Sequence, residues 1–144
     1  VHVRLAAGVA SGDLPVTRAF GIDGRLAGVS PFGSLRARTG RLVLAKRYAL
    51  VAWEHDLRSI PFELLGWRGA APRGVTLQVH GAHAWADTFG GVGSGLGPLE
   101  PVLGYHEVGV SLGLGYSAPV RLDMTYRLSE DSGVVIGVGV ARLF

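Results

Sequence analysis

The chain has 144 residues, a length that suits one domain. Charged residues make up only 17% of it, against about 25% in an ordinary soluble domain, while apolar residues make up 48%. This apolar content excludes a disordered chain, and the lack of any run of 18 apolar residues excludes a transmembrane helix. The net charge of +3 comes from scattered arginines, which argues against a nucleic-acid surface.

Cysteine is absent and glycine is abundant, with 23 residues. The first fact excludes disulfides, thiol catalysis and cysteine-ligated metals. The second, together with a mean hydropathy of +0.32, is typical of a membrane β-barrel, in which outward apolar residues alternate with inward polar or small ones. Because Val1 lies directly inside a strand-like stretch, we expect the chain to be a processed or truncated piece of a longer protein.

Alternation with a period of two residues predicts six strands and no helix. The expected strands are 1–10, 48–57, 75–85, 108–117, 120–128 and 134–144. The pattern is cleanest in the last three, whose length of about ten residues suits a tilted membrane strand. In 120–128, for example, one face carries apolar side chains and the other carries Arg121, Asp123, Thr125 and Arg127.

The connections between these strands differ in length. If the chain ends on the periplasmic side, the outside loops are 11–45, 86–105 and 129–133, and the periplasmic turns are 58–73 and 118–119. The apolar stretch 62–67, flanked by prolines, is predicted as a turn or a strand extension. Six strands are too few to close a membrane barrel, so we expect further strands from a missing N-terminal part or from a partner chain.

Four passages resemble the C-terminal barrel segment of the bacterial surface antigen superfamily, the BamA, TamA and FhaC type. The strand before the family's long sixth loop is similar to Val3-Arg4-Leu5 through Gly8, Ser11-Gly12-Asp13-Leu14-Pro15 and Phe20-Gly21-Ile22-Asp23-Gly24. The tip motif of that loop resembles Phe32-Gly33-Ser34-Leu35-Arg36, and the next strand resembles 48–55. The penultimate hairpin resembles 113–123, and the chain ends on an aromatic residue, as family members do.

The resemblance implies that residues 1–144 form the C-terminal part of one outer-membrane β-barrel domain, strands eleven to sixteen of sixteen. It implies that loop 11–45 folds into the lumen and that Arg36 latches onto inward carboxylates, which by alternation are Glu54 and Asp123. It also implies an assembly signal at the end of the chain, formed by Val138, Val140 and Phe144.

The remaining polar positions have two interpretations. Arg121, Arg127 and His80 would line the lumen, either as an ionic lining that docks the loop or as the ordinary polarity of such a lumen. His80 and His83 are spaced as metal ligands on a helix, but on a strand they point to opposite sides, so we expect no metal site. The string Gly109-Val110-Ser111-Leu112-Gly113 lies inside an alternating strand, so we do not expect a nucleophile elbow there.

The function that this resemblance implies is insertion or translocation of polypeptides across or into the outer membrane of a Gram-negative cell, without enzymatic activity or cofactor. It implies a loop latch through Arg36 and a lateral seam at the last strand that can open. The implied partners are outer-membrane lipid, the barrel-assembly machinery and a polypeptide substrate. Two alternatives stay open: a barrel that only anchors, or forms a pore for, another domain, and a soluble β-sandwich or lipocalin-like binder. Upstream POTRA repeats would favour the first function, and an upstream hydrolase domain would favour anchoring.

Overall fold

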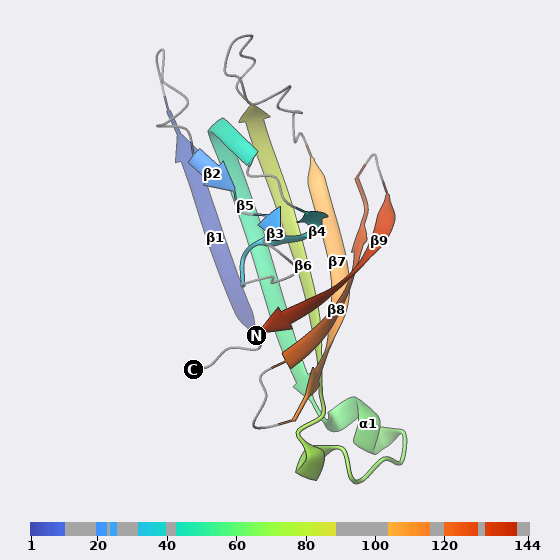
Figure 1. Ribbon diagram of the computed structural model, residues 1–144. Coiled ribbons are helices and arrows are strands. Elements are labelled where there is room, and N and C mark those ends of the chain that lie inside the picture. The colour runs from blue at the N-terminus through green and yellow to red at the C-terminus, as the bar shows by residue number, and fades with distance from the viewer. Residues whose placement is uncertain are drawn as a thin grey trace.

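The computed structural model describes residues 1–10, 20–22, 24–25, 32–39, 43–88, 104–115, 120–129 and 132–140. It is an all-β structure built on one open antiparallel sheet (Figure 1). The strands of the main path are β1 (His2–Val9), β5 (Val43–Arg58), β6 (Thr76–Thr88), β7 (Tyr105–Leu114), β8 (Val120–Arg127) and β9 (Gly133–Val140). They lie in the order β1-β5-β6-β7-β8-β9, so the six predicted strands are confirmed.

Several strand boundaries differ from the prediction. Strand β5 begins at Val43, inside the predicted loop 11–45, and β6 and β7 extend into the predicted loop 86–105. These added residues continue the antiparallel ladders between β5, β6 and β7. Alternation of side chains did not reveal them, because backbone pairing across a ladder does not require it. The glycine-rich stretch 89–103 and residues 116–119 lie outside the described residues.

Three short strands lie within the predicted loop 11–45. Strand β2 (Phe20–Ile22) pairs with β5, while β3 (Gly24–Arg25) pairs in parallel with β4 (Leu35–Thr39). Figure 1 shows β3 and β4 crossing the middle of the main sheet. Small side chains on β5 and β6 make room for this segment. The buried cluster there is Ile22, Leu35, Ala45, Leu50, Ala52, Ala82, Ala84, Ala86 and Tyr105.

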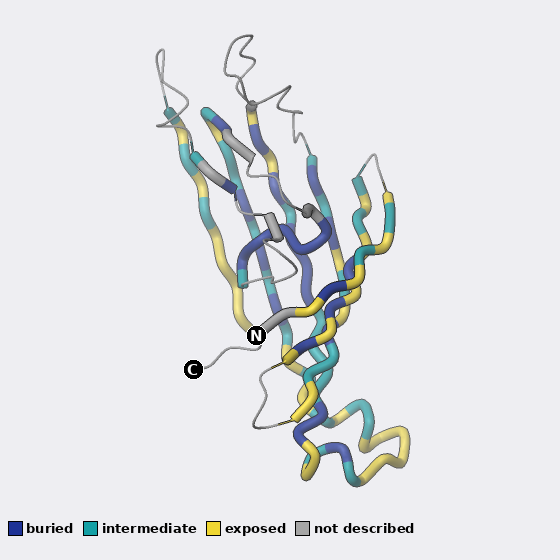
Figure 2. The backbone as a smooth tube through the Cα atoms, in the orientation of Figure 1, coloured by how far each residue is buried: buried dark blue, intermediate teal, exposed yellow. Residues whose placement is uncertain are grey.

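The two faces of the sheet differ in polarity and in burial, and buried and exposed positions alternate along several strands (Figure 2). On the outer face, register pairs join apolar side chains into continuous rows, and most of these side chains are exposed, Ile136 by 73%. Two such rows are Leu77, Leu112, Leu122 and Val138, and Val79, Val110, Met124 and Ile136. Beside the small apolar residues that pack under β4, the buried positions of the same strands include six polar ones: His80, Glu107, Ser111, Arg121, Asp123 and Thr125. Exposed apolar rows opposite a buried polar cluster are the reverse of an ordinary soluble β fold.

The connection between β5 and β6 contains a helix that the sequence analysis missed. Helix α1 (Ile60–Leu64) is followed by the 3₁₀ turn η2 (Ala71–Arg73). Pro61 stands in the first turn of α1, where its missing N–H costs nothing, and the Ser59 hydroxyl donates a 2.7 Å hydrogen bond to the Glu63 carboxylate. These start signals fall in a stretch too short for a visible helical period. No helix in the described residues is long and apolar enough to cross a membrane.

Candidate functional site

The side chain of Arg36, on β4, lies at the centre of the inner face of the sheet. Its guanidinium forms a buried ion pair with Glu54 on β5, and its Nη1 lies 3.4 Å from Asp123 Oδ1 on β8. The same Nη1 donates a 3.1 Å hydrogen bond to the Ser111 hydroxyl on β7. The structure therefore brings together the three residues assigned to the loop latch. Arg36 is only 4% exposed, so this pairing offsets the cost of burying its charge.

The backbone of β4 is held separately, by Glu107 on β7. Its Oε1 accepts the Arg36 N–H at 2.7 Å, and its Oε2 accepts the Ala37 N–H at 2.8 Å. The Tyr105 hydroxyl donates to Oε2 at 2.7 Å. One buried carboxylate thus accepts hydrogen bonds from two consecutive backbone N–H groups of β4. Side-chain and backbone contacts together fix the position of Arg36 on the sheet.

A second arginine, Arg121 on β8, bridges the two carboxylates of the latch. Its Nη1 lies 3.6 Å from Glu54 Oε1, and its Nε lies 2.8 Å from Asp123 Oδ1. Burial, and then the positive charge of Arg121, lower the pKa of Arg36 to about 10, so the Arg36 guanidinium stays protonated at neutral pH. The result is an alternating network in which each guanidinium contacts both carboxylates.

His80 connects this network to the next row of the sheet. The Ser111 hydroxyl donates to Asp123 Oδ1 at 2.6 Å, so its proton is not available to His80. The His80 Nδ1, 3.0 Å from Ser111 Oγ, therefore carries a proton and donates it. In the neutral imidazole with its proton on Nδ1, the Nε2 atom, 3.0 Å from the Thr125 hydroxyl, accepts a hydrogen bond from it.

Ser111, His80 and Asp123 do not form a catalytic relay in this arrangement. In a Ser-His-Asp relay the histidine stands between the hydroxyl and the carboxylate. Here the hydroxyl stands between the other two groups, and it is fully buried. Ser111 is a structural bridge between the imidazole and the ionic network.

Gly109 provides the space that this network needs. A Cβ there would collide with the Met124 carbonyl and the His80 imidazole. We expect Gly109→Ala to lower the free energy of unfolding by about 1–3 kcal/mol, the usual cost of overpacking. The matched control is Gly113→Ala on the same strand, where the close neighbour is the Thr76 side chain, which can change rotamer. Urea titration of both variants measures the effect, and equal losses would contradict it.

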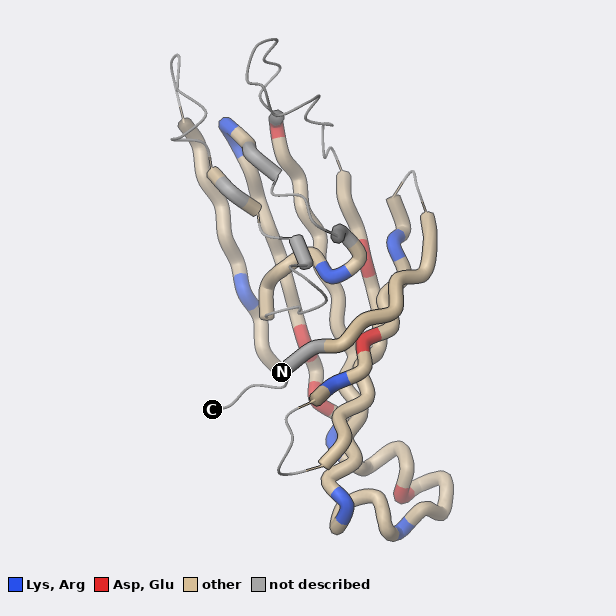
Figure 3. The backbone as a smooth tube through the Cα atoms, viewed as in Figure 1, with Lys and Arg blue, Asp and Glu red and all other residues tan. Residues whose placement is uncertain are grey.

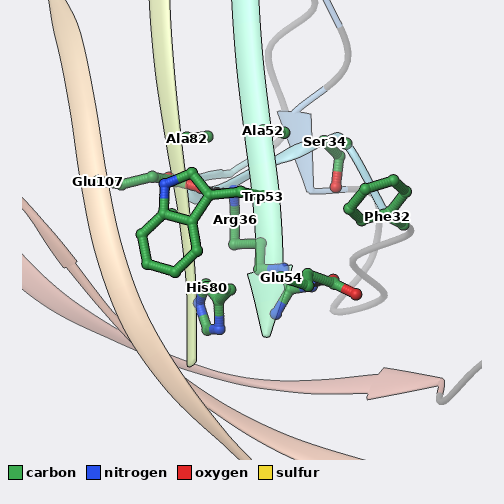
Figure 4. A pocket seen from close by; sticks show the side chains of 11 residues that line it. Phe32, Ser34, Arg36, Ala52, Trp53, Glu54, His80, Ala82 and Glu107 are labelled. Atoms are coloured by element: carbon green, nitrogen blue, oxygen red, sulfur yellow. Dashed lines mark hydrogen bonds and ion pairs between the residues drawn. The ribbon is translucent and has the colours of Figure 1, made fainter. Parts of the chain in front are cut away.

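The cluster leaves almost no free volume. The cavity among Arg36, Glu54, His80 and Glu107 measures about 10 Å³, at the lower limit for one water molecule (Figure 4). Figure 3 shows the basic position of β4 in front of acidic positions on the strands behind it. The arrangement therefore holds a strand across the inner face rather than leaving a pocket for a small molecule there.

The other predicted site residues lie in several places. Arg121 and His80 are buried on the inner face, and Arg127 is half-buried on the same face. Val138 is exposed on the outer face of β9, and Val140 ends that strand. Phe144 lies outside the described residues.

Sequence reasoning missed Glu107 and Tyr105 because the predicted strand began at Val108. Extending the alternation by one step from Gly109 and Ser111 would have placed Glu107 on the inner face. Ser111 was recognised as an inward residue, but its contact with Arg36 depends on how β4 lies over the sheet. No local pattern carries that information.

His83 lies on the outer face, opposite to His80, as the alternation predicts for a strand. It pairs with His106, with 2.9 Å between the two Nδ1 atoms. No group of three or more His, Cys, Asp or Glu among the described residues is placed to hold a metal ion.

Comparison of the chain with protein-family models, curated proteins and solved structures finds no match.

Proposed function

We propose that this chain is part of an outer-membrane β-barrel of the bacterial surface antigen type, and that it inserts or translocates polypeptides. The observation that carries the proposal is the reversed polarity of the sheet. Apolar rows cover its exposed outer face, while a buried ionic network occupies its inner face. A bilayer is the solvent in which such an outer face is stable, and a lumen accommodates such an inner face.

The held position of β4 supports the transport part of the proposal. Arg36 is fixed by groups from three different strands, β5, β7 and β8. A segment held in this way occludes the lumen and, when released, opens it. The edges of the described sheet, β1 and β9, have no further strand partner among the described residues, so closure of the barrel needs other strands.

Membrane fractionation of the natural, full-length protein, with heated and unheated gel lanes, tests the barrel. We expect the protein in the outer-membrane fraction, with a mobility that changes on heating because a closed barrel resists detergent until it is heated. A soluble protein with the same mobility in both lanes would contradict the proposal. The apolar rows would then have to be covered by another protein layer.

Trapping of a polypeptide substrate tests the transport function separately. A photo-crosslinker placed at Phe32, half-buried beside the latch, should capture a passing or inserting chain in cells. The same crosslinker at Met124, on the outer face of β8, is the control and should capture no such chain from the lumen. A heat-modifiable barrel that captures nothing at Phe32 would favour the anchoring function instead.

A further inference from the structure

The connection from Ser59 to Val75, which we name the β5–β6 turn, exposes large apolar side chains at one end of the sheet. Leu64 is 83% exposed, Leu65 is 86% exposed, and Trp67 is 45% exposed. Trp67 is oriented by an edge contact with Phe62, with 5.8 Å between the ring centroids. A loop that served only to connect two strands would not need these side chains in solvent.

Charge on the same turn is predominantly basic (Figure 3). Arg68 and Arg73 are exposed, and the single acidic residue of the turn, Glu63, accepts the Ser59 hydroxyl. Arg58, just before the turn, is exposed as well. Arg73 Nη1 donates to the Gly69 carbonyl at 3.3 Å, which folds its side chain over the turn. The Arg68 guanidinium has no hydrogen-bond or ion-pair partner among the described residues. Basic and large apolar side chains therefore occupy one short segment.

Most backbone N–H groups of the turn donate hydrogen bonds to carbonyl groups within the turn. Leu65 donates to Pro61, Trp67 to Phe62 and Ala70 to Trp67, all at 2.9–3.2 Å. The later part closes in the same way, through Arg73, Gly74 and Val75. A segment whose N–H groups are bonded internally can enter the interface of a bilayer at little cost in lost hydrogen bonds to water.

The turn is continuous with the apolar outer face. Arg58, the last residue of β5, pairs with Leu77, and Leu77 begins the row that runs through Leu112 to Leu122. The turn therefore starts next to the Leu77 end of this row. Aromatic and basic residues at the edge of an apolar band are the composition found where a protein meets lipid headgroups.

We propose that the β5–β6 turn is an interfacial anchor that binds anionic glycerophospholipid. Leu64, Leu65 and Trp67 enter the acyl boundary, and Arg68 and Arg73 contact the phosphate groups. The proposal rests on the membrane location proposed above, and it adds a lipid site at the end of the barrel, away from the Arg36 network. The choice of an anionic lipid follows from the excess of two arginines over one glutamate within the turn.

Tryptophan quenching in bilayers tests the anchor. The full-length protein is reconstituted into phosphatidylcholine that contains increasing fractions of brominated phosphatidylglycerol. The signal of Trp67 is the difference between wild type and Trp67→Phe. We expect half-quenching of wild type at a phosphatidylglycerol fraction roughly fivefold lower than for Arg68→Gln, because one interfacial arginine contributes about 1 kcal/mol of attraction to an anionic surface.

Arg47→Gln is the matched control. It removes an exposed arginine of β5 at the opposite end of the sheet, so it should leave Trp67 quenching unchanged. Equal half-quenching of wild type by brominated phosphatidylglycerol and by brominated phosphatidylcholine would overturn the anionic preference. A heat-modifiable barrel whose Trp67 is quenched by neither lipid would overturn the anchor. A protein partner that covers the turn would give this result. A protein that neither enters bilayers nor shifts on heating would instead overturn the proposed function.

Discussion

Replacing Arg36 with alanine should lower the free energy of unfolding by about 3–5 kcal/mol, because it leaves two buried carboxylates without one of their cations. Glu54 loses its buried ion pair with Arg36, and Asp123 loses a contact of 3.4 Å. We expect the barrel still to form and to shift on heating, since the strand ladders do not involve this side chain. Insertion or translocation of the polypeptide should be lost. Denaturant titration and the substrate-trapping assay measure the two effects.

Two further variants separate charge from geometry at the same position. Arg36→Lys keeps the positive charge but cannot reach Glu54, Ser111 and Asp123 together, so it should restore only part of the lost stability. The double variant Arg36→Ala/Glu54→Gln should be more stable than the sum of the single losses predicts, by about 0.5–3 kcal/mol. Strict additivity, or unchanged transport in Arg36→Ala, would contradict the latch.

Alternation along the chain was sufficient for the strands and for much of the inner face. It placed Glu54, His80 and Asp123 on one side before any contact was known, because side chains two residues apart in a strand share a face. The same rule separated His80 from His83, which lie on opposite faces. In a sheet with one polar face and one apolar face, the face of each residue is thus encoded locally.

The position of β4 over the sheet was predictable only through the family resemblance. Strand β4 contacts β7 and β8, which lie far later in the chain, as in the hydrogen bond from Ala37 to Glu107, 70 positions apart. Contacts over such separations leave no periodic trace in sequence. The helix within the β5–β6 turn was missed for a different reason, since a helix of five residues is shorter than two helical turns.

The Arg36 network and the β5–β6 turn use arginine in opposite ways. Arg36 and Arg121 are buried and paired with carboxylates, which gives fixed geometry. Arg68 is exposed without such a partner among the described residues, which leaves it available to an external anion. In the proposals above, the network therefore controls whether the lumen is closed, and the turn controls the depth of the protein in the bilayer. Variants in one should leave the readout of the other unchanged.

Replacing Glu107 with alanine should cost about 2–6 kcal/mol, because it removes the acceptor of two buried N–H groups at about 1–3 kcal/mol each. The Arg36 and Ala37 amides, now bonded at 2.7 and 2.8 Å, should exchange their hydrogens much faster. Glu107→Gln should be nearly as damaging as alanine, because its amide NH₂ would face one of these two donors. Hydrogen exchange at the two amides, with urea titration, measures the effect.

Tyr105→Phe is the control for this position. It removes the hydroxyl that donates to Glu107 Oε2 but leaves both backbone contacts, so it should cost only about 0.5–1.5 kcal/mol and leave the two amides protected. Protected Arg36 and Ala37 amides in Glu107→Ala would show that the side-chain contacts of Arg36 alone hold β4. Rapid exchange in Glu107→Ala with Arg36 still paired to Glu54 would show that backbone and side chain hold the segment independently, and that release of the lumen requires both to break.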